Sequence, residues 1–284
     1  MDEAHIAQLL GSRVVARRPV TGGNTPAERW IVKLADDRTA FVKVATDDLT
    51  AVWLRKEIRV YSELQAPFMP ELLGWADERG RPMLILEDLS DSSWPPPWEP
   101  EWVVTALGAL AQLSALPLPS WLSPSPDLAW IGDGWQRVGK DPGPLLATGI
   151  VSAGWLDRAL PVLFEAGPPS VAEGNRLCHF DIRSDNLSFR PDGSAVIIDW
   201  NFLEIGNPRL DLAFWLPSLA LEGGPMPEKI LPDAAAEAAV VAGYFASRCG
   251  LPPIPDAPHL REFQARQLLV ALPWACRALG LPPP

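Results

Sequence analysis

Short runs of alternating apolar and polar residues fill the first ninety positions and predict a small β-sheet. In these runs β-branched and other apolar residues alternate with charged ones, as in strands that bury one face. The charged triplet Asp36-Asp37-Arg38 lies between two runs and predicts a hairpin turn. The expected strands are Arg13–Val20, Arg29–Leu34, Thr39–Ala45, Leu72–Asp77 and Met83–Glu87.

A helical pattern interrupts these strands. Leu54, Ile58, Tyr61 and Leu64 recur at a spacing of three and four residues, which places them on one face of a helix. Asp48 is the expected start of this helix, because an aspartate side chain can accept a hydrogen bond from a backbone N–H of the first turn. The first part of the chain therefore predicts an antiparallel sheet with one helix.

A proline-rich segment, Ser92–Pro100, separates this part from the rest of the chain. Beyond it, apolar residues recur mostly at helical spacing. The segment Leu116–Gly149 is an exception. Its prolines, glycines and tryptophans recur with no regular spacing, so no helix or strand is predicted there. The expected helices are Trp102–Ala115, Ser152–Glu165, Pro208–Leu221, Asp233–Cys249 and His259–Leu279.

Composition indicates a globular protein of one large domain or two lobes. The chain has 284 residues, of which 48% are hydrophobic. No apolar run reaches the roughly 20 residues of a membrane-spanning helix, and the first ten residues lack a basic, apolar signal sequence. Three widely spaced cysteines argue against a disulfide framework or a zinc site. These features predict a soluble, cytoplasmic protein.

Negative charge is unevenly distributed. The net charge is −11; residues 1–90 contribute −2, from 14 acidic and 12 basic residues, and residues 91–284 contribute −9. Nucleic acid and anionic membranes are poor partners for such a surface. A cationic ligand fits better, although solubility alone can explain a modest acidic excess.

The most informative residues for chemistry lie in the stretch His179–Asn186, which reads HFDIRSDN. Asn186 follows Asp181 by five positions, and an apolar run delivers Asp199. Two short strands around the turn Pro191-Asp192-Gly193 would bring Asn186 and Asp199 to the same end of a hairpin. A base that accepts a hydroxyl proton and an Asn–Asp pair that holds Mg²⁺ are used in phosphoryl transfer. The alternative is two surface turns, since Asp and Asn are common turn formers.

The segment Leu177–Leu216 resembles the aminoglycoside phosphotransferase and choline kinase-like family. In place of the Asp-Phe-Gly of protein kinases it carries Ile198-Asp199-Trp200, followed by Gly206-Asn207-Pro208 and Asp211-Leu212-Ala213. The resemblance implies an α+β, protein-kinase-like bilobal fold. Residues 1–89 would form a nucleotide-binding N-lobe, a small antiparallel sheet with one helix. Residues 90–284 would form a larger, mainly helical C-lobe with the catalytic loop and the acceptor site.

Lys43 and Glu57 are the candidates for the nucleotide half of the site. Lys43 lies in an otherwise apolar strand, where a kinase lysine pairs with nucleotide phosphates and is held by a helix glutamate. It could also carry its charge to the surface. Glu57 lies beside the apolar face of the predicted helix, and Glu63 is the alternative.

Two backbone segments complete this half. Gly22, Gly23 and Asn24 lie between the first two strands, where glycine lets backbone N–H groups approach phosphate closely. They also fit an ordinary hairpin turn. The resemblance places an adenine-binding hinge around Glu87 and Leu89, with contacts to backbone groups. Because backbone contacts leave little trace in a sequence, ATP is the expected donor and GTP is not excluded.

The resemblance implies an ATP- and Mg²⁺-dependent kinase of a hydroxylated small molecule. The acceptor could be an aminoglycoside-like antibiotic, a sugar, a choline-like amine or an amino alcohol. The acidic excess of residues 91–284 predicts that it is cationic. A nucleotide-binding pseudokinase is an alternative that the complete set of five site residues argues against. A protein kinase is another, and Ile198-Asp199-Trp200 and the missing A-P-E segment argue against it.

Further residues near the motif have several possible roles. Arg183 could contact a phosphate or an anionic substrate, or form an ion pair with Asp185 or Asp211. The resemblance implies that Asp211 holds backbone amides of the catalytic loop. Trp200 and Trp215 could form an aromatic wall against the acceptor, with core packing as the alternative, above all for Trp215. The candidates for acidic contacts are Glu204, Glu222 and Glu228.

Overall fold

The structure, a computed structural model, describes residues 3–21, 26–78, 80–255 and 257–284 and forms two compact units. Unit 1 comprises Met1–Pro95 and Asp185–Phe202, and unit 2 comprises Pro96–Ser184 and Leu203–Pro284. The sequence-based division after residue 89 assigned 185–202 to the second lobe. In the structure these residues belong to unit 1, because they form a hairpin that bonds to the backbone of that unit.

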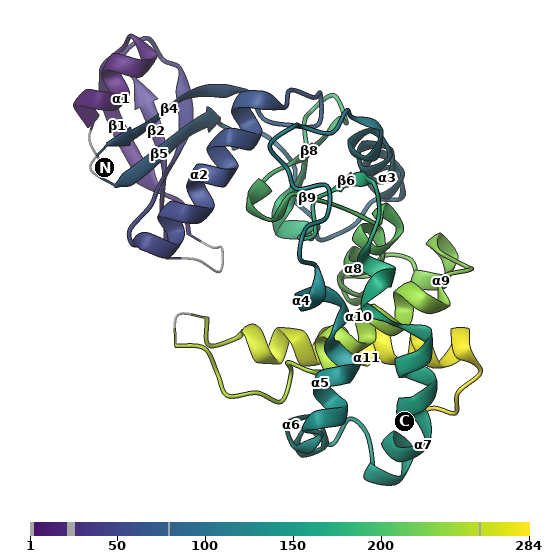
Figure 1. Ribbon diagram of the computed structural model, residues 1–284. Helices are drawn as coiled ribbons and strands as arrows, with labels where there is room; N and C mark the ends of the chain where they lie inside the picture. The colour runs from purple at the N-terminus through teal and green to yellow at the C-terminus, as the bar shows by residue number, and fades with distance from the viewer. Residues whose placement is uncertain (1–2, 22–25, 79, 256) are drawn as a thin grey trace. The chain divides into compact units, whose positions relative to one another are not determined.

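A five-stranded sheet is the frame of unit 1, and most of its strands are labelled in Figure 1. The strand order is β1-β2-β3-β5-β4, and every neighbouring pair is antiparallel. Each strand matches a predicted run, and its ends differ from the prediction by at most two residues. The strands are β1 (Val14–Pro19), β2 (Glu28–Leu34), β3 (Thr39–Val44), β4 (Leu72–Glu78) and β5 (Arg81–Glu87).

The two faces of this sheet carry different helices. On one face Ile6, from helix α1 (Glu3–Leu10), packs in an apolar cluster with Val42, Val44 and Ile85. Because successive strand residues point to opposite faces, Lys43 points away from this cluster. It points to the face on which helix α2 (Asp48–Glu63) contacts β5.

The start of α2 differs by one residue from the prediction. Its N-cap is Asp47, not Asp48. The Asp47 carboxylate accepts a hydrogen bond from the Thr50 N–H at 2.8 Å, and the Thr50 hydroxyl accepts one from the Asp47 N–H at 3.1 Å. This reciprocal pair satisfies two N–H groups at the helix start, whereas Asp48 lies already inside the first turn.

The predicted hairpin after the HFDIRSDN stretch is present in unit 1. Strands β7 (Leu187–Phe189) and β8 (Ala195–Ile197) pair antiparallel. Gly193 turns the chain between them with a φ of 83°, a left-handed conformation that glycine adopts without strain. The Ile197 N–H donates to the Phe68 carbonyl at 2.7 Å, and the Ser93 N–H donates to the Phe189 carbonyl at 2.8 Å. These bonds attach the hairpin to unit 1.

Helices make up most of unit 2. The segment 116–149, to which no element was assigned, holds the short helices α4, α5 and α6, which have four, seven and five residues. Helices this short show no clear period. The elements are α3 (Pro100–Ala115), α4 (Ala129–Gly132), α5 (Gly134–Lys140), α6 (Gly143–Ala147), α7 (Ala153–Ala166), η1 (Pro169–Ala172), β6 (Arg176–Cys178), β9 (Glu204–Gly206), α8 (Pro208–Leu221), α9 (Pro227–Ile230), α10 (Ala235–Ala246) and α11 (Leu260–Leu279).

Helix α10 is the core of unit 2 and contacts α4, α5, α7, α8 and α11. Its small residues let these neighbours come close. At Gly243 a Cβ atom would lie 2.7 Å from the ring of Trp135, so a larger side chain would displace α5. The Trp135 indole N–H donates to the Ala239 carbonyl at 2.7 Å, which satisfies the polar group of a buried ring.

The predicted fold class is confirmed: an antiparallel sheet with helices in one unit and a mainly helical second unit. Cys178, Cys249 and Cys276 are free and buried. Within the described ranges, no helix is both long enough and apolar enough to cross a lipid bilayer.

Candidate active site

An ion-paired lysine joins three of the predicted site residues in unit 1. The Lys43 ammonium lies 2.6 Å from the Glu57 carboxylate and 2.7 Å from the Asp199 carboxylate. Lys43 is 8% exposed and Glu57 2%. The alternative partner, Glu63, instead pairs with Arg59 on an exposed face of α2. The structure therefore selects Glu57 as the helix glutamate beside Lys43.

Both carboxylates keep the buried lysine charged. Burial alone would lower the pKa of Lys43, but the negative charges of Asp199 and Glu57 outweigh it and raise this pKa to about 12. Burial raises the pKa of Glu57, and the lysine opposes that rise. A charge that is removed from water in this way is stable only with its partners in place. Removing Lys43 would leave the two carboxylates without their counter-charge.

Asn186 and Asp199 offer oxygen atoms at the open end of the β7–β8 hairpin. The Ile198 N–H donates to the Asn186 carbonyl at 3.0 Å, which keeps the two ends of the hairpin adjacent. Asp199 has a φ of 66°, a left-handed conformation that aspartate tolerates better than most residues. Such values are common at functional sites.

These two side chains fit Mg²⁺. Mg²⁺ is commonly bound by one or two protein oxygen ligands together with water and substrate phosphates. Among the residues that the structure describes, no group of three or more His, Cys, Asp or Glu forms a metal cage. The donor set of Asn186 and Asp199 therefore suits a metal that phosphate oxygens help to hold.

Asp181 lies in unit 2, on the loop that follows β6. The carboxylate of Asp211, from α8, accepts hydrogen bonds from the backbone N–H groups of His179 at 2.8 Å and Phe180 at 2.7 Å. The expectation that Asp211 holds the amides of this loop is confirmed. Phe180 has a φ of 58°, which is strained for an aromatic residue. At Gly206 a Cβ atom would lie 2.6 Å from the Phe180 ring, so a larger residue there would displace this ring.

Asp211 gives the protein a pH dependence whose sign follows from its burial. Burial raises its pKa from 3.8 to about 6, and the two N–H bonds only partly oppose this. Between these values the folded protein holds a proton that the unfolded chain has lost. The bound proton stabilises the folded protein. Its contribution to the free energy of unfolding is therefore fully present below about pH 4 and is lost as the pH rises through about 6.

The variant Asp211→Asn cannot titrate at this position and therefore serves as the reference for this pH effect. Between pH 4 and 7 the free energy of unfolding of the wild type should fall by up to about 3 kcal/mol relative to that of the variant. Urea unfolding of both proteins at the two pH values measures the difference. If the difference in free energy of unfolding between the two proteins did not change with pH, the two N–H groups would fully offset the effect of burial on the pKa of Asp211.

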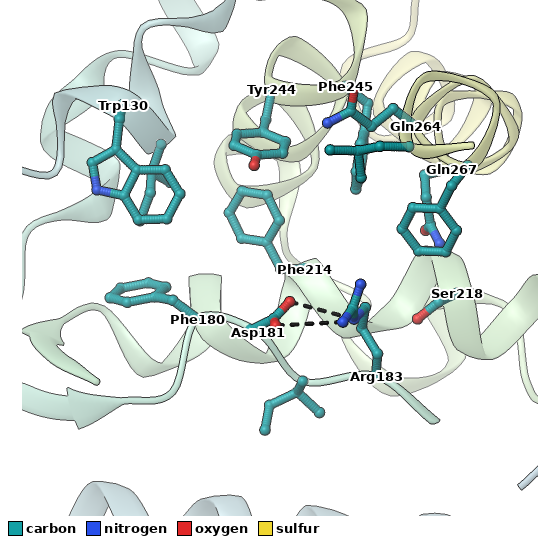
Figure 2. Close-up of a pocket in the computed structure, with 14 residues that line it drawn as sticks. Trp130, Phe180, Asp181, Arg183, Phe214, Ser218, Tyr244, Phe245, Gln264 and Gln267 are labelled. Carbon is teal, nitrogen blue, oxygen red and sulfur yellow. Dashed lines mark hydrogen bonds and ion pairs between the residues drawn. The ribbon is translucent and has the colours of Figure 1, made fainter. Parts of the chain in front are cut away.

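Arg183 is the ionic partner of Asp181 (Figure 2). Its Nε lies 3.4 Å from one carboxylate oxygen of Asp181, and its Nη2 lies 3.5 Å from the other. The guanidinium also lies over the Phe263 ring, 5.7 Å from its centre. The sequence suggested Asp185 or Asp211 as partners and did not suggest this pair with Asp181.

A pocket in unit 2 opens at Asp181 (Figure 2), with an empty volume of about 640 Å³ that includes space open to solvent. Its polar lining comprises Arg183, Ser218, Gln264 and Gln267 besides Asp181. Most of the remaining wall is aromatic. The rings belong to Trp130, Phe180, Phe214, Tyr244, Phe245 and Phe263. These residues were not predicted, because they come from the catalytic loop and four helices and share no local motif.

The suggested aromatic wall of Trp200 and Trp215 is wrong. Both side chains are completely buried. The Trp200 indole donates to the Ile197 carbonyl at 3.0 Å, and Trp215 packs against Trp98 with ring centres 5.4 Å apart. Both tryptophans therefore belong to the core and cannot reach an acceptor.

Two of the suggested acidic contacts have structural partners. Glu222 accepts hydrogen bonds from the Ser184 hydroxyl at 2.7 Å and from the Trp98 indole at 2.8 Å. It thereby ties the end of the catalytic loop to the proline-rich segment. Glu228 pairs with Arg277 at 2.8 Å. Neither of these carboxylates lines the pocket at Asp181.

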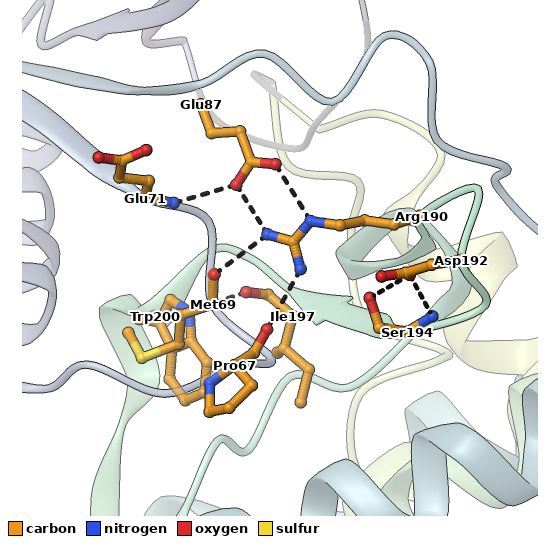
Figure 3. A network of polar contacts seen from close by, with 9 residues as sticks. All are labelled: Pro67, Met69, Glu71, Glu87, Arg190, Asp192, Ser194, Ile197 and Trp200. Carbon is orange, nitrogen blue, oxygen red and sulfur yellow. Dashed lines mark hydrogen bonds and ion pairs between the residues drawn. The ribbon is translucent and has the colours of Figure 1, made fainter.

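The side chain of Glu87, in the predicted hinge, is bound by Arg190 (Figure 3). Arg190 donates to the two oxygens of Glu87 at 3.1 Å and 2.7 Å. Its other N–H groups reach the carbonyls of Pro67 and Met69 at 3.2 Å and 3.4 Å. The carboxylate thus connects β5 to the hairpin, and adenine binding at Glu87 and Leu89 stays a prediction about their backbone groups. Gly22, Gly23 and Asn24 lie outside the described residues.

Arg190→Ala should destabilise the protein by about 1–2 kcal/mol, because Glu87 and two carbonyls lose a charged donor. Arg190→Lys should recover only part of this loss, since lysine cannot make the two-pronged contact. Urea unfolding measures both effects. Arg59→Ala, which breaks an exposed pair with Glu63, is the matched control and should cost about 0.5 kcal/mol or less. Equal losses at Arg190 and Arg59 would contradict the structural role of Arg190.

Comparisons with known proteins agree with this arrangement. The sequence model of the phosphotransferase enzyme family matches residues 17–249, most of the chain. A search among curated proteins returned no match. A thermostable mutant of the aminoglycoside phosphotransferase APH(4)-Ia in its apo form has 14% identity and a TM-score of 0.59, with 98% of each chain covered.

Two further solved structures share the fold. The ethanolamine kinase of Plasmodium vivax has 10% identity and a TM-score of 0.56, over 91% of this chain and 82% of its own. The ternary complex of APH(2")-IIa with streptomycin and ATP has 13% identity and a TM-score of 0.54, over 94% of each chain. At such low identities these likenesses establish the protein-kinase-like fold, and the resemblance of Leu177–Leu216 is confirmed by the family match.

Proposed function

This chain belongs to the phosphotransferase enzyme family, and from that membership we propose that it is an ATP- and Mg²⁺-dependent kinase of a small hydroxylated molecule. The observation that carries the proposal is the buried Lys43, paired at 2.6 Å with Glu57 and at 2.7 Å with Asp199. A buried lysine between two carboxylates contributes little net stability. Phosphate binding gives such a group a function.

The nucleotide would be bound by residues of unit 1. Lys43 pairs with its phosphates, and Glu57 keeps the ammonium in place. Asn186 and Asp199 would hold Mg²⁺, which when bound would neutralise negative charge on the phosphates. Backbone groups around Glu87 and Leu89 bind the base. GTP in place of ATP remains compatible with these contacts.

The acceptor hydroxyl would be activated by Asp181. Its carboxylate accepts the hydroxyl proton as the oxygen attacks the γ-phosphate in a direct transfer, without a covalent enzyme intermediate. Positioning supplies much of the rate enhancement in such a reaction. In this chain Asp211 fixes the backbone before Asp181, Gly206 leaves room for the Phe180 ring, and Arg183 orients the Asp181 carboxylate.

The acceptor is a small molecule that enters the pocket at Asp181. Two of the similar solved structures are, by their names, an aminoglycoside phosphotransferase and an ethanolamine kinase. Their names describe the substrates of those two proteins and not of this chain. For this chain we propose a hydroxylated compound of similar size. From the acidic excess of residues 91–284 the sequence predicted a positively charged acceptor, whereas Asp181 is the one carboxylate among the described residues that line the pocket.

Radiolabelled ATP tests the proposal. The purified protein is incubated with γ-labelled ATP, with and without Mg²⁺, and with a broad panel of hydroxylated amines, sugars and antibiotics. The expected result is Mg²⁺-dependent transfer of label to at least one acceptor. Tight binding of Mg-ATP without transfer to any of them would favour a pseudokinase, and absence of nucleotide binding would refute the proposal.

A further inference from the structure

The pocket at Asp181 offers little negative charge to a cation. Asp181 is the one carboxylate among the described residues that line it, and Arg183 pairs with it at 3.4 Å. The acidic excess of residues 91–284 therefore lies elsewhere on the chain. Binding of a polycationic acceptor needs several carboxylates at the contact, because each ammonium group loses its hydration on entering the pocket.

Two aromatic rings of this pocket already contact arginines of the protein. The guanidinium of Arg183, which lines the pocket, lies 5.7 Å from the ring centre of Phe263, and that of Arg248, which does not line it, lies 3.8 Å from the ring centre of Tyr244. A cationic ligand would meet the like charge of Arg183, and cation–π attraction at these two rings is already shared with the arginines. The aromatic wall therefore favours an uncharged apolar surface.

Two glutamines of α11 supply neutral hydrogen-bonding groups to the pocket (Figure 2). Gln267 is 1% exposed, and its Oε1 has no hydrogen-bond partner among the described residues. Buried polar atoms are nearly always paired, so an unpaired one needs an explanation. Gln264 accepts a bond from Arg261 through its Oε1 at 2.9 Å, so its Nε2 is the end that can donate.

We propose that the acceptor is an uncharged, sugar-like polyol with one apolar face, and that Gln267 selects it. The inference rests on the proposed function, because it concerns the acceptor of that transfer. The apolar face of the ring packs on the aromatic side chains. One hydroxyl donates to Gln267 Oε1, and another reaches the Asp181 carboxylate for phosphorylation. Hydroxyl groups both donate and accept, so they suit a pair of amides that present one acceptor and one donor.

Isosteric pairs of compounds that differ in charge test the proposal. Glucosamine is compared with glucose, and choline with the neutral alcohol in which carbon replaces its nitrogen. A wider panel of sugars and alicyclic polyols with matched amino derivatives follows. Binding to the full-length protein is measured by saturation-transfer NMR, and transfer is measured with labelled ATP and Mg²⁺.

The neutral members are expected to bind at least about tenfold more tightly than their cationic partners. Preferential binding or phosphorylation of the cationic members overturns the proposal, as does a panel in which no neutral member binds. These outcomes are separate from failure of the proposed function, which appears as lack of Mg-ATP binding or of transfer to any compound, charged or neutral.

Variants of Gln267 test the selecting residue. Gln267→Leu should weaken binding of the neutral acceptor roughly tenfold, because the ligand donor then has no partner. Gln267→Glu, nearly equal in shape, should shift the preference toward the cationic member of each pair. Gln112→Glu adds the same charge on an exposed face of α3 and should leave the preference unchanged. Equal preferences in wild type, Gln267→Leu and Gln267→Glu would refute the role of Gln267.

Discussion

Replacement of Asp181 by asparagine should lower turnover by roughly two to four orders of magnitude and leave nucleotide binding nearly unchanged. The loss is that of a positioned general base, which typically contributes a factor of about 10² to 10⁴. Asparagine keeps the shape of the side chain but cannot accept the hydroxyl proton. Nucleotide binding should persist because Lys43, Glu57, Asn186 and Asp199 belong to unit 1, whereas Asp181 belongs to unit 2.

The structure also predicts how the protein tolerates this substitution. Asp181 lies 3.4 Å from Arg183 and is partly exposed, and ion pairs that water reaches contribute little to stability. The backbone of the loop depends on Asp211 rather than on Asp181, through bonds of 2.8 Å and 2.7 Å. The free energy of unfolding should therefore change little, which separates a catalytic defect from misfolding.

Single-turnover transfer from labelled ATP and calorimetric titration with Mg-ATP measure the two sides of this prediction. Asp157→Asn, at an exposed position of α7, removes the same charge from unit 2 and should leave turnover unchanged. An Asp181→Asn protein that turns over at the wild-type rate would show that another group accepts the proton.

Asp199→Asn should abolish transfer and weaken binding of Mg-ATP. Asp199 lies at the hairpin end with Asn186, and its carboxylate contacts Lys43 at 2.7 Å. The substitution removes the carboxylate expected to hold Mg²⁺ and one of the two partners of a buried lysine. We expect a fall in turnover of at least about a hundredfold, since metal and lysine both serve the phosphates.

Asparagine is the appropriate replacement because of the backbone at this position. Asp199 has a φ of 66°, which asparagine adopts more readily than alanine. Alanine would add backbone strain and make the cause of a loss ambiguous. Calorimetry with ATP in the presence and absence of Mg²⁺ distinguishes the two roles, because the wild type should gain affinity from the metal and the variant should not.

Asp192→Asn is the matched control in the same hairpin. Asp192 is exposed and accepts bonds from Ser194 at 2.9 Å and 2.7 Å within the turn. It should affect local stability and leave the metal dependence of ATP binding intact. If Asp199→Asn bound Mg-ATP as tightly as the wild type and remained active, its assignment to the metal would be refuted.

Features that depend only on residues close together in the sequence could be predicted without the structure. The strands of unit 1 follow from alternation of apolar and polar residues, and the long helices follow from apolar residues at helical spacing. The hairpin β7–β8 brings Asn186 and Asp199 together because the turn at Gly193 fixes its register. Such patterns are local because backbone geometry repeats every two or about 3.6 residues.

Tertiary structure decided the partners of charged and aromatic groups. Lys43 contacts Asp199 across 156 positions, and no periodicity encodes that distance. Glu57 and Glu63 both lie in the predicted helix and were both candidates. Only the packing of α2 against the sheet shows that Glu57 is the one buried beside Lys43. Trp200 was a candidate for the acceptor site by its place beside Asp199, yet core packing made it inaccessible.

The same limit applies to the acceptor. Composition determined the charge of the chain, −9 over residues 91–284, and suggested a cationic ligand. Where those charges lie depends on which helix faces meet, because a pocket is lined by residues that are distant in sequence. In unit 2 the packing of α8, α10 and α11 surrounds Asp181 with rings, amides and an arginine. The sequence determined the strands of unit 1, the long helices and the loop chemistry, and the packing of helices determined what the pocket can bind.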